Sequence, residues 1–482
     1  MATYERLTGL DEAFLGFETA NAHMHVAVTA LLEAGPLRTP SGGVDKERIH
    51  RHFASRLRTL PRFRQRLEFV PFTQDAVWVD DERFDLKYHL RHISLPRPGT
   101  TAQLQECCAE ILERPLSRSR PLWEAWVVEG VGDDEFALIV KVHHCIVDGI
   151  AGIGRRVALL DPMPVDAPDV VPAWRPRPHP SRRELLRDEV ARRVQGTVAV
   201  GQTMARSLVH LRDSADQFGT AMGSLVRLAR KGLSAAPASC FNEPIGPHRR
   251  VAWLALDLDR IRRLKNRLGG TVNDVVLTAV SGALGSTLRR RNDPAGNAAL
   301  RVVVPVSTRS AEEIGAPGNR VSLWLVPLPL AERDPRRRLA RIRETTDELK
   351  RGQAAAGGTV ITEAANWAGG AVVAAGARLL NGARLYNLIV TNVPGPTIPL
   401  YLLGARVRAA YPHLPLFENQ GLGIALLSYC GQLHVGITAD WDHGALLDEV
   451  AGQLDACFAE LLLLAGEPPA AVVRPARIAV AG

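Results

Sequence analysis

Several kinds of segment are absent from this chain of 482 residues. Cysteine occurs only six times and never as Cys-x-x-Cys, so neither a zinc ribbon nor a dithiol redox site is indicated. No uninterrupted apolar run reaches about 18 residues, so the sequence predicts no membrane-spanning helix. Acidic residues come early and no apolar segment follows them, so no signal peptide is evident and a cytoplasmic location is expected.

The motifs of two common reaction types are also missing. There is no Gly-x-Ser-x-Gly segment, the turn that exposes the nucleophile of many serine hydrolases. There is no glycine-rich loop ending in Lys-Ser or Lys-Thr, which binds nucleoside triphosphates in other proteins. The sequence therefore predicts no covalent nucleophile and no resident cofactor.

The overall composition is that of a folded protein with more than one domain. A chain of this length is too long for one ordinary core, so two domains are expected. Hydrophobic residues make up 46% and charged residues 23%, which is ordinary for globular proteins. The formal net charge of +8 suits phosphorylated ligands or an anionic membrane surface, and nothing points to nucleic acid.

The most informative stretch follows an apolar run rich in β-branched residues, 136–142, which predicts one buried strand. The run ends at His143 and His144, and three residues later comes Asp148-Gly149, a turn signal. Apolar residues then recur at helical spacing. Because neighbouring side chains on a strand point to opposite faces, only one of the two histidines can face a given cleft.

Three interpretations fit the histidine pair. Both rings can be packed in a core before a turn. With Asp148 they can form a two-histidine, one-carboxylate metal site. One of them can act as a general base, because histidine has an unperturbed pKa near neutrality. A metal site is disfavoured, because neighbours on a strand diverge and no third ligand stands at motif spacing.

The pattern His-His-x-x-x-Asp-Gly at 143–149 resembles the signature of the acyltransferase superfamily that includes chloramphenicol acetyltransferase, carnitine acyltransferases and peptide-synthetase condensation domains. The opening layout Leu-Asp…Phe…Glu…His-Met-His-Val resembles that of bacterial wax ester synthases/diacylglycerol acyltransferases. Further elements follow in the order of that family: Pro-Leu-Trp at 121–123, Asn-Asp at 273–274 and Thr-Asn-Val-Pro-Gly-Pro at 391–396. The superfamily's late Asp-Phe-Gly-Trp-Gly motif is not found, which argues against kinship with chloramphenicol acetyltransferase or the plant acyltransferases.

The resemblance, which runs from Leu7 to about Leu464, implies an α/β (α+β) fold. Two chloramphenicol-acetyltransferase-like domains are expected, each a mixed β-sheet flanked by helices, with an active-site tunnel at their interface. The implied division is a first domain with the histidine motif, a Pro/Arg-rich and helical linker, a second domain and a loose tail, at 1–165, 166–240, 241–466 and 467–482.

The resemblance also implies roles around the motif. His144 is expected to be the general base, with His143 as the second choice. Asp148 is expected to hold the turn that positions His144, through an ion pair with Arg309 from the second domain. Gly149 can adopt backbone angles that a β-carbon would forbid.

Other residues are expected to line the cleft. Asn273 and Asp274 open a helix for which Thr271 is the predicted N-cap, and Asn392 follows a strand. A helix N-terminus offers unpaired N–H groups, so Asn273 is a candidate for binding the carbonyl oxygen, and plain capping is the alternative. The resemblance places four more residues along the substrate channel, of which Trp123 has core packing as its alternative: Pro121, Leu122, Trp123 and Gly395.

The implied activity is O-acyl transfer from acyl-CoA, a co-substrate, to diacylglycerol (triacylglycerol synthesis) or a fatty alcohol (wax ester synthesis). Two alternatives remain: an acyltransferase that uses a carrier-protein thioester or another alcohol, and a non-catalytic lipid-binding protein. Peripheral contact with the inner membrane face or lipid inclusions is expected, as a monomer or homodimer. The candidate contact segments are 198–232, otherwise a packed helical linker, and 398–403, otherwise a core strand.

Overall fold

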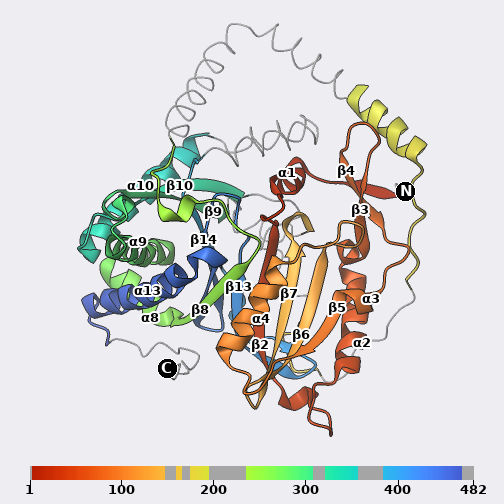
Figure 1. Cartoon of the computed structure of the whole chain (residues 1–482), viewed down its shortest axis with the longest axis horizontal. Helices are drawn as coiled ribbons and strands as arrows, with labels where there is room; N and C mark the ends of the chain where they lie inside the picture. Colours follow the sequence, from red (N-terminus) through yellow and green to blue (C-terminus); the bar gives the residue numbers. More distant parts are fainter. Residues whose placement is uncertain are drawn as a thin grey trace.

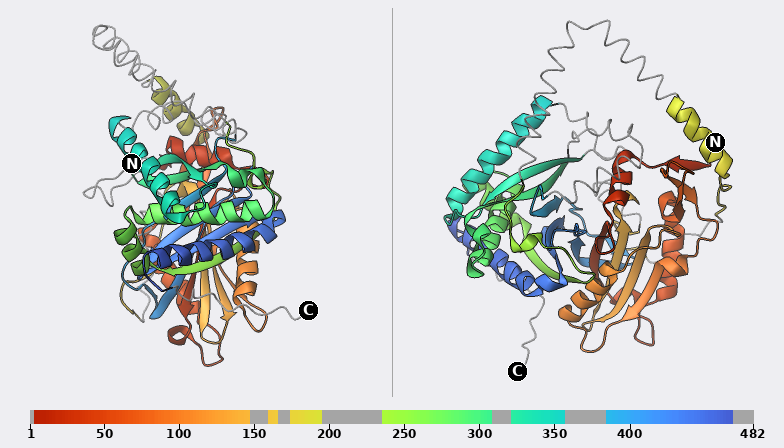
Figure 2. Two further views of the ribbon diagram at one scale, coloured as in Figure 1. Left: turned by 90° about the vertical axis from the view of Figure 1, so that its left-hand side faces the viewer. Right: turned by 45° about the horizontal axis from the view of Figure 1, so that its top comes forward.

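The computed structural model describes residues 3–146, 159–165, 174–194, 235–307, 321–356 and 384–468 (Figure 1). Within these residues, two six-stranded sheets form two halves that lie side by side (Figure 2). Each sheet mixes parallel and antiparallel pairs and carries helices, which confirms the predicted fold class. A three-stranded sheet is attached to the first half and runs in the order β1 (Tyr4–Arg6), β4 (Ala76–Asp80) and β3 (Gln65–Phe69).

The first sheet has the order β12-β13-β2-β7-β6-β5. Its helices are packed on both faces, with apolar residues of α2 on one face and of α4 on the other. The strands are β2 (His25–Glu33), β5 (Leu90–Ser94), β6 (Trp123–Val131), β7 (Glu135–His143), β12 (Tyr401–Leu402) and β13 (Ala405–His413). The helices are α1 (Gly9–Phe17), α2 (Lys46–Arg56), α3 (Leu86–His89), α4 (Thr101–Glu113) and a further one at 182–194.

The second sheet has the order β10-β9-β11-β14-β15-β8, and its helices gather around the buried helix α9. The predicted N-cap of α9 is confirmed: the Thr271 hydroxyl accepts the N–H of Asp274 at 3.2 Å. The strands are β8 (Arg249–Asp257), β9 (Ala299–Ser307), β10 (Val321–Pro329), β11 (Leu388–Val393), β14 (Leu422–Tyr429) and β15 (Gln432–Asp440). The helices are α8 (Leu258–Leu268), α9 (Val272–Arg290), α10 (Pro335–Ala356) and α13 (Gly444–Leu464).

One strand crosses between the halves. β13 pairs antiparallel with β2, so residues 401–413 belong to the first sheet although the expected division assigned them to the second domain. Leu402 and Leu403 are buried in the core of the first half, while Ile398 is half exposed. The core-strand alternative is therefore confirmed for the later residues of this segment, which complete a sheet and are not available for lipid contact.

The two halves meet where β13 passes β15. Trp253 of β8 stacks on Tyr411 of β13 with ring centroids 4.8 Å apart. Gly436 of β15 lies so close to the chain of β13 that a β-carbon there would overlap the carbonyl oxygen of Pro412. Residues of α4 join the same apolar cluster and contact β8. The interface is thus a packed core and includes a backbone crossing that only glycine permits.

Several predicted segments lie outside the described residues. These are the helix after the histidine motif up to residue 158, most of the 166–240 linker with its 198–232 segment, and the tail from residue 469. No helix in the described ranges is both long and apolar enough to cross a membrane.

Candidate active site

His144 lies at the end of the central strand of the first sheet. β7 ends at His143, and the chain then enters a single 3-10 turn, η4 (His144–Ile146). The backbone N–H of His144 donates to the carbonyl oxygen of Met24 at 2.8 Å. Phe14 of α1 stacks on the His144 ring, with centroids 3.9 Å apart. Burial lowers the pKa of His144 to about 4, so the ring is neutral at neutral pH and can accept a proton.

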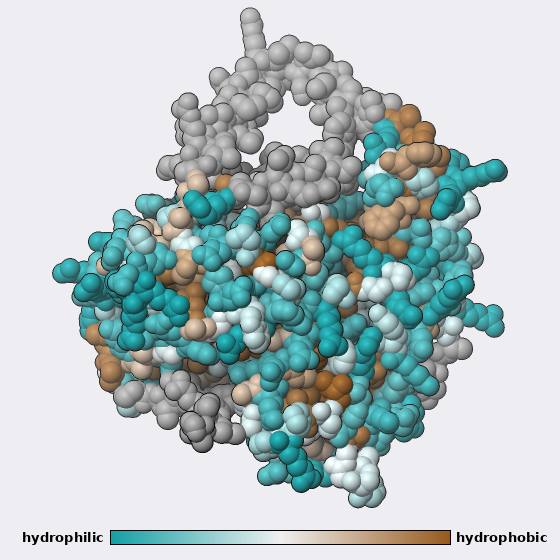
Figure 3. Space-filling view, in the orientation of Figure 1, coloured by the Kyte–Doolittle hydropathy of each residue, from teal (hydrophilic) through white to brown (hydrophobic). Residues whose placement is uncertain are grey.

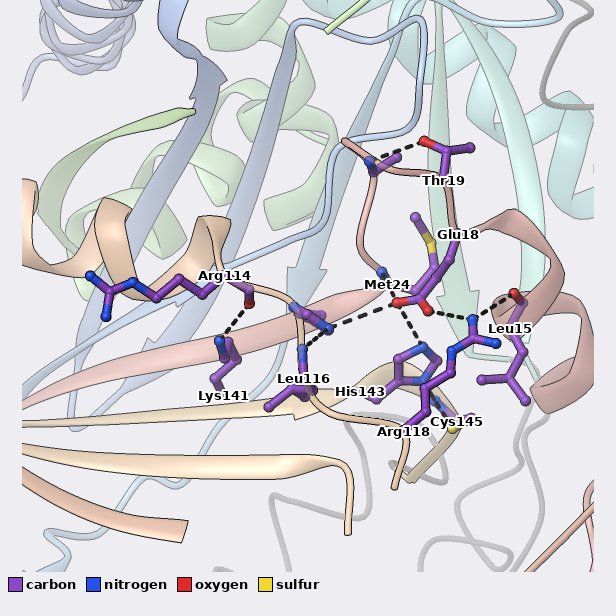
Figure 4. A network of polar contacts seen from close by, with 12 residues as sticks. Leu15, Glu18, Thr19, Met24, Arg114, Leu116, Arg118, Lys141, His143 and Cys145 are labelled. Carbon is purple, nitrogen blue, oxygen red and sulfur yellow. Dashed lines mark hydrogen bonds and ion pairs between the residues drawn. The ribbon is translucent and has the colours of Figure 1, made fainter. Parts of the chain in front are cut away.

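His143 points to a different set of partners (Figure 4). Its Nδ1 accepts the backbone N–H of Cys145 at 3.1 Å. Its Nε2 lies 3.2 Å from the carboxylate of Glu18, the residue that ends α1. Since Nδ1 accepts, the ring N–H lies at Nε2, on the side of Glu18. The two histidines therefore have separate surroundings, as expected from their adjacency.

Glu18 collects several positive or donating groups. Its carboxylate accepts the N–H of Met24 at 3.1 Å and a guanidinium N–H of Arg118 at 2.6 Å. The ring of His25 lies 3.8 Å away. Burial alone would raise the pKa of Glu18, but the neighbouring His143 ring and the Arg118 guanidinium hold it well below its usual range. Glu18 is therefore a largely buried anion beside the motif.

A buried lysine supports the same region. Lys141 is fully buried in β7, and its Nζ donates to the carbonyl oxygens of Ile111 and Arg114, each at 2.8 Å. The carboxylate of Glu124 lies 3.8 Å away. Burial lowers the pKa of Lys141 to about 8. Lys141 thus anchors the end of α4 to the strand that presents the histidines.

Cys145, His143 and Glu18 have the connectivity of a cysteine nucleophile with its base and orienting carboxylate, because Cys145 Sγ is 2.8 Å from His143 Nδ1. The thiol, however, is buried in an apolar cluster with Trp78, Leu116 and others, and burial raises its pKa well above the usual range. A thiol that stays protonated is a poor nucleophile. The arrangement therefore favours a packing role for Cys145.

The structure corrects the expectation for Asp274. One carboxylate oxygen accepts from the backbone N–H and hydroxyl of Thr271, each at 2.8 Å, and the other accepts from the hydroxyl of Thr346 at 2.9 Å. Asp274 is buried and caps α9, so it does not face a cleft. Asn273 is half-buried in the first turn of α9, and Asn392 is half-buried in β11 beside Leu426 of β14.

The Pro-Leu-Trp segment is packed in the core, which confirms the core alternative for Trp123 and differs from the channel position expected for Leu122. Trp123 is fully buried, donates from Nε1 to the carbonyl oxygen of Phe63 at 2.7 Å, and stacks on His89. Leu122 is buried too, and its carbonyl oxygen accepts the N–H of His143 at 2.9 Å. Neither side chain exposes surface to a channel, because both are packed in the core. Pro121 is buried as well.

The Thr-Asn-Val-Pro-Gly-Pro segment passes closely beside the end of β14. The N–H of Gly395 donates to the hydroxyl of Ser428 at 3.0 Å, and a β-carbon at this position would overlap the carbonyl oxygen of Ser428. Glycine is therefore required here for backbone packing.

Three expected residues, Asp148, Gly149 and Arg309, lie outside the described ranges. The predictions of an ion pair between Asp148 and Arg309 and of a turn at Gly149 remain predictions. Conversely, sequence reasoning missed Glu18 and Lys141. Two sequence features could have pointed to them. Glu18 is an acidic residue shortly before His-Met-His-Val, and Lys141 is a lone lysine inside an apolar strand. Among the described side chains, no cluster of three or more His, Cys, Asp or Glu is arranged to hold a metal ion.

Two halves built on mixed sheets, with a half-buried histidine at the end of a central strand, have the chloramphenicol-acetyltransferase-like fold of acyltransferases. The starter condensation domain of rhizomide synthetase shares this fold, with a TM-score of 0.55 at 12% identity over 98% of both chains. The wax ester synthase/diacylglycerol acyltransferase of Marinobacter aquaeolei VT8 is more similar, with a TM-score of 0.66 at 25% identity over 96% of this chain and 100% of that one.

Sequence comparison identifies the family. The wax ester synthase/diacylglycerol acyltransferase catalytic domain matches residues 7–276, and the C-terminal domain of the same family matches residues 317–461. Two Mycobacterium tuberculosis proteins named as probable diacylglycerol O-acyltransferases are similar: tgs1 at 32% identity (95% of this chain, 96% of the relative) and tgs2 at 33% (89% and 92%). The chain belongs to the wax ester synthase/diacylglycerol acyltransferase family and is an acyltransferase.

Proposed function

We propose that this enzyme transfers a long-chain acyl group from acyl-CoA to the free hydroxyl of diacylglycerol, and that a fatty alcohol serves as a second acceptor. The family description names a wax ester synthase and a diacylglycerol acyltransferase, and the two mycobacterial relatives are named for diacylglycerol. The observation that carries the chemistry is the half-buried His144, whose pKa is lowered to about 4, within the matched catalytic domain. Acyl-CoA is a co-substrate, and no cofactor takes part.

In the proposed step, His144 accepts the hydroxyl proton while the acceptor oxygen attacks the thioester carbonyl carbon. The tetrahedral intermediate then expels the thiolate as the carbon–sulfur bond breaks, and the imidazolium returns the proton to the sulfur. The products are an ester and free coenzyme A, so atoms and charge balance. General base catalysis of this kind contributes roughly 10² to 10⁴ in rate. A donor to the oxyanion adds about 3 kcal/mol, and Asn273 is the candidate.

The assay that tests this function measures free thiol released from palmitoyl-CoA with dioleoylglycerol, hexadecanol or no acceptor. We expect acceptor-dependent release, greater with dioleoylglycerol, and triacylglycerol as the separated product. If no thiol were released with either acceptor and an ester formed from an acyl carrier-protein thioester, the protein would instead be an acyltransferase that uses a carrier-protein donor. Lipid binding without any ester product would identify a binding protein.

We also propose that the protein docks on an anionic lipid surface, where its acceptor resides. Phe72, at the tip of the β3–β4 hairpin, is 89% exposed, and Val190 and Val194 on the neighbouring helix are more than half exposed. Hairpin and helix are adjacent, because Asp75 forms ion pairs with Arg192 of that helix at 3.3 Å. Figure 3 shows apolar surface beside this helix. Exposed apolar side chains among arginines suit an anionic membrane.

Flotation with phosphatidylglycerol-containing vesicles tests this surface. The double variant Phe72→Ser/Val190→Ser is expected to bind vesicles several-fold more weakly than wild type, because it loses exposed apolar area without touching the core. Leu463→Ser is the matched control, since Leu463 is 57% exposed on α13, in the other half. Equal flotation of all three proteins would contradict the docking surface.

A further inference from the structure

Glu18 is the centre of the polar network that surrounds the histidine motif (Figure 4). Two routes lead from its carboxylate to His144, one through Met24 and one through His143. We infer that Glu18 is a positioning residue, which acts through these two neighbours to hold the ring and backbone of His144 in place. The inference rests on the proposed function, because it assigns His144 as the base.

The first route runs through the backbone. Glu18 accepts the N–H of Met24 at 3.1 Å, and the carbonyl oxygen of Met24 accepts the N–H of His144 at 2.8 Å. Both peptide groups of Met24 are thereby engaged, one by the carboxylate and one by the proposed base. Glu18 thus fixes the position of Met24, the residue just before β2, and Met24 in turn fixes the backbone of the turn that carries His144.

The second route runs through the ring of His143. Its Nε2 faces Glu18 at 3.2 Å, and its Nδ1 accepts the N–H of Cys145 at 3.1 Å. Residues 143 and 145 are thus joined across His144, which lies between them in the chain. Rotation of the His143 ring would release the Cys145 N–H and loosen the turn. Glu18 opposes that rotation and selects the tautomer in which Nδ1 accepts.

The same segment also holds the His144 ring. Phe14, whose ring stacks on His144 at 3.9 Å, belongs to α1, and Glu18 is the C-cap residue of that helix. Arg118 bonds to both Glu18 and the carbonyl oxygen of Leu15, so it fixes the end of α1 against the loop after α4. A carboxylate that is this enclosed serves orientation, since nothing in these contacts brings it to a reacting atom.

The kinetic test compares Glu18→Gln, Glu18→Ala and the control Glu12→Gln. Glu12 lies on the same helix, but its carboxyl faces Ala76 of β4. We expect Glu18→Ala to lower kcat about 100-fold, the scale of a small misplacement of a catalytic group, with KM within about twofold. Glu18→Gln, which keeps an acceptor oxygen, should recover part of the loss. Glu12→Gln should match wild type.

A double-mutant cycle separates positioning from general support of the fold. If Glu18 acts largely through His143, then Glu18→Ala in a His143→Ala background costs much less than it does alone. Independent structural effects would instead multiply. Multiplying losses would overturn the route through His143, and an unchanged kcat in Glu18→Ala would overturn the whole inference.

A spectroscopic measurement keeps the inference testable if the proposed activity fails. Nitrogen NMR of the imidazole side chains, assigned with a His143→Gln variant, reports the tautomer of His143 without substrate. We expect a shift of that signal in Glu18→Gln, a variant that preserves side-chain size, and none in Glu12→Gln. If the wild type were inactive but the shift were present, the proposed substrates would be wrong and the positioning role of Glu18 would stand. Absence of the shift would reject the positioning role.

Discussion

His144→Ala is expected to lower kcat for acyl transfer by roughly 10² to 10⁴, because the variant loses the group that accepts the hydroxyl proton. Thiol release from palmitoyl-CoA with dioleoylglycerol measures the effect. His434→Phe is the matched control: His434 is buried in β15, and within the described part of the chain neither of its ring nitrogens has a hydrogen-bond partner. If His144→Ala were as active as wild type, the protein would still be an acyltransferase, but His144 would not be its general base.

The same ring sets the expected pH dependence. A base must be neutral to accept a proton, so kcat/KM falls as the pH drops through the pKa of the free enzyme's base. Because burial lowers the pKa of His144 to about 4, the acid limb should lie near pH 4 and well below 6.5. Circular dichroism at each pH separates this limb from acid unfolding. A limb near 6.5 in folded enzyme would contradict the assignment.

Gly436→Ala is expected to destabilise the fold by about 3 kcal/mol or more, because the added methyl group overlaps the Pro412 carbonyl where the two sheets cross. Neither backbone can move without breaking a sheet ladder, since Gly436 pairs with both Ala425 and Trp253. Urea unfolding followed by tryptophan fluorescence measures the loss.

Gly452→Ala supplies the control for that substitution. Gly452 lies inside α13, and a β-carbon there has nothing within 4 Å. The change should stabilise the protein by about 0.5–1 kcal/mol, because alanine loses less backbone entropy in a helix. If both alanine variants had the same stability, the crossing at Pro412 would not be under steric constraint.

Features with a local cause could be predicted from the sequence. The strand before the histidine pair follows from an apolar β-branched run, and the N-cap at Thr271 follows from its hydroxyl before a helix. The hairpin of β14 and β15 also has a local cause, because Cys430 and Gly431 both have positive φ in its turn. Each of these depends on residues close together in the chain.

Features that depend on distant partners could not be predicted in the same way. The alternation of apolar and polar residues in β13 does not show which sheet edge the strand joins, because a strand with this pattern can pair with several edges. For Trp123 the sequence left both core packing and a channel position open, and its burial is decided by Phe63 and His89, which come from other elements. The resemblance implied that Asp274 faces the cleft. In the structure its carboxylate caps α9, and it also accepts a hydrogen bond from Thr346 of α10, which is distant in the sequence. A single carboxylate such as Glu18 has no periodicity to reveal its partners.

The crossing strand has a consequence for synthesis on the ribosome. β2 and β7 leave the ribosome early, but β13, which pairs with the free edge of β2, is among the last strands to be translated. At typical rates of about 5–20 residues per second, the edge beside His25 stays unpaired for tens of seconds. An unpaired strand edge invites pairing with other chains. Nascent and truncated chains therefore present an aggregation-prone edge directly beside the future catalytic centre, and only a nearly complete polypeptide can close it.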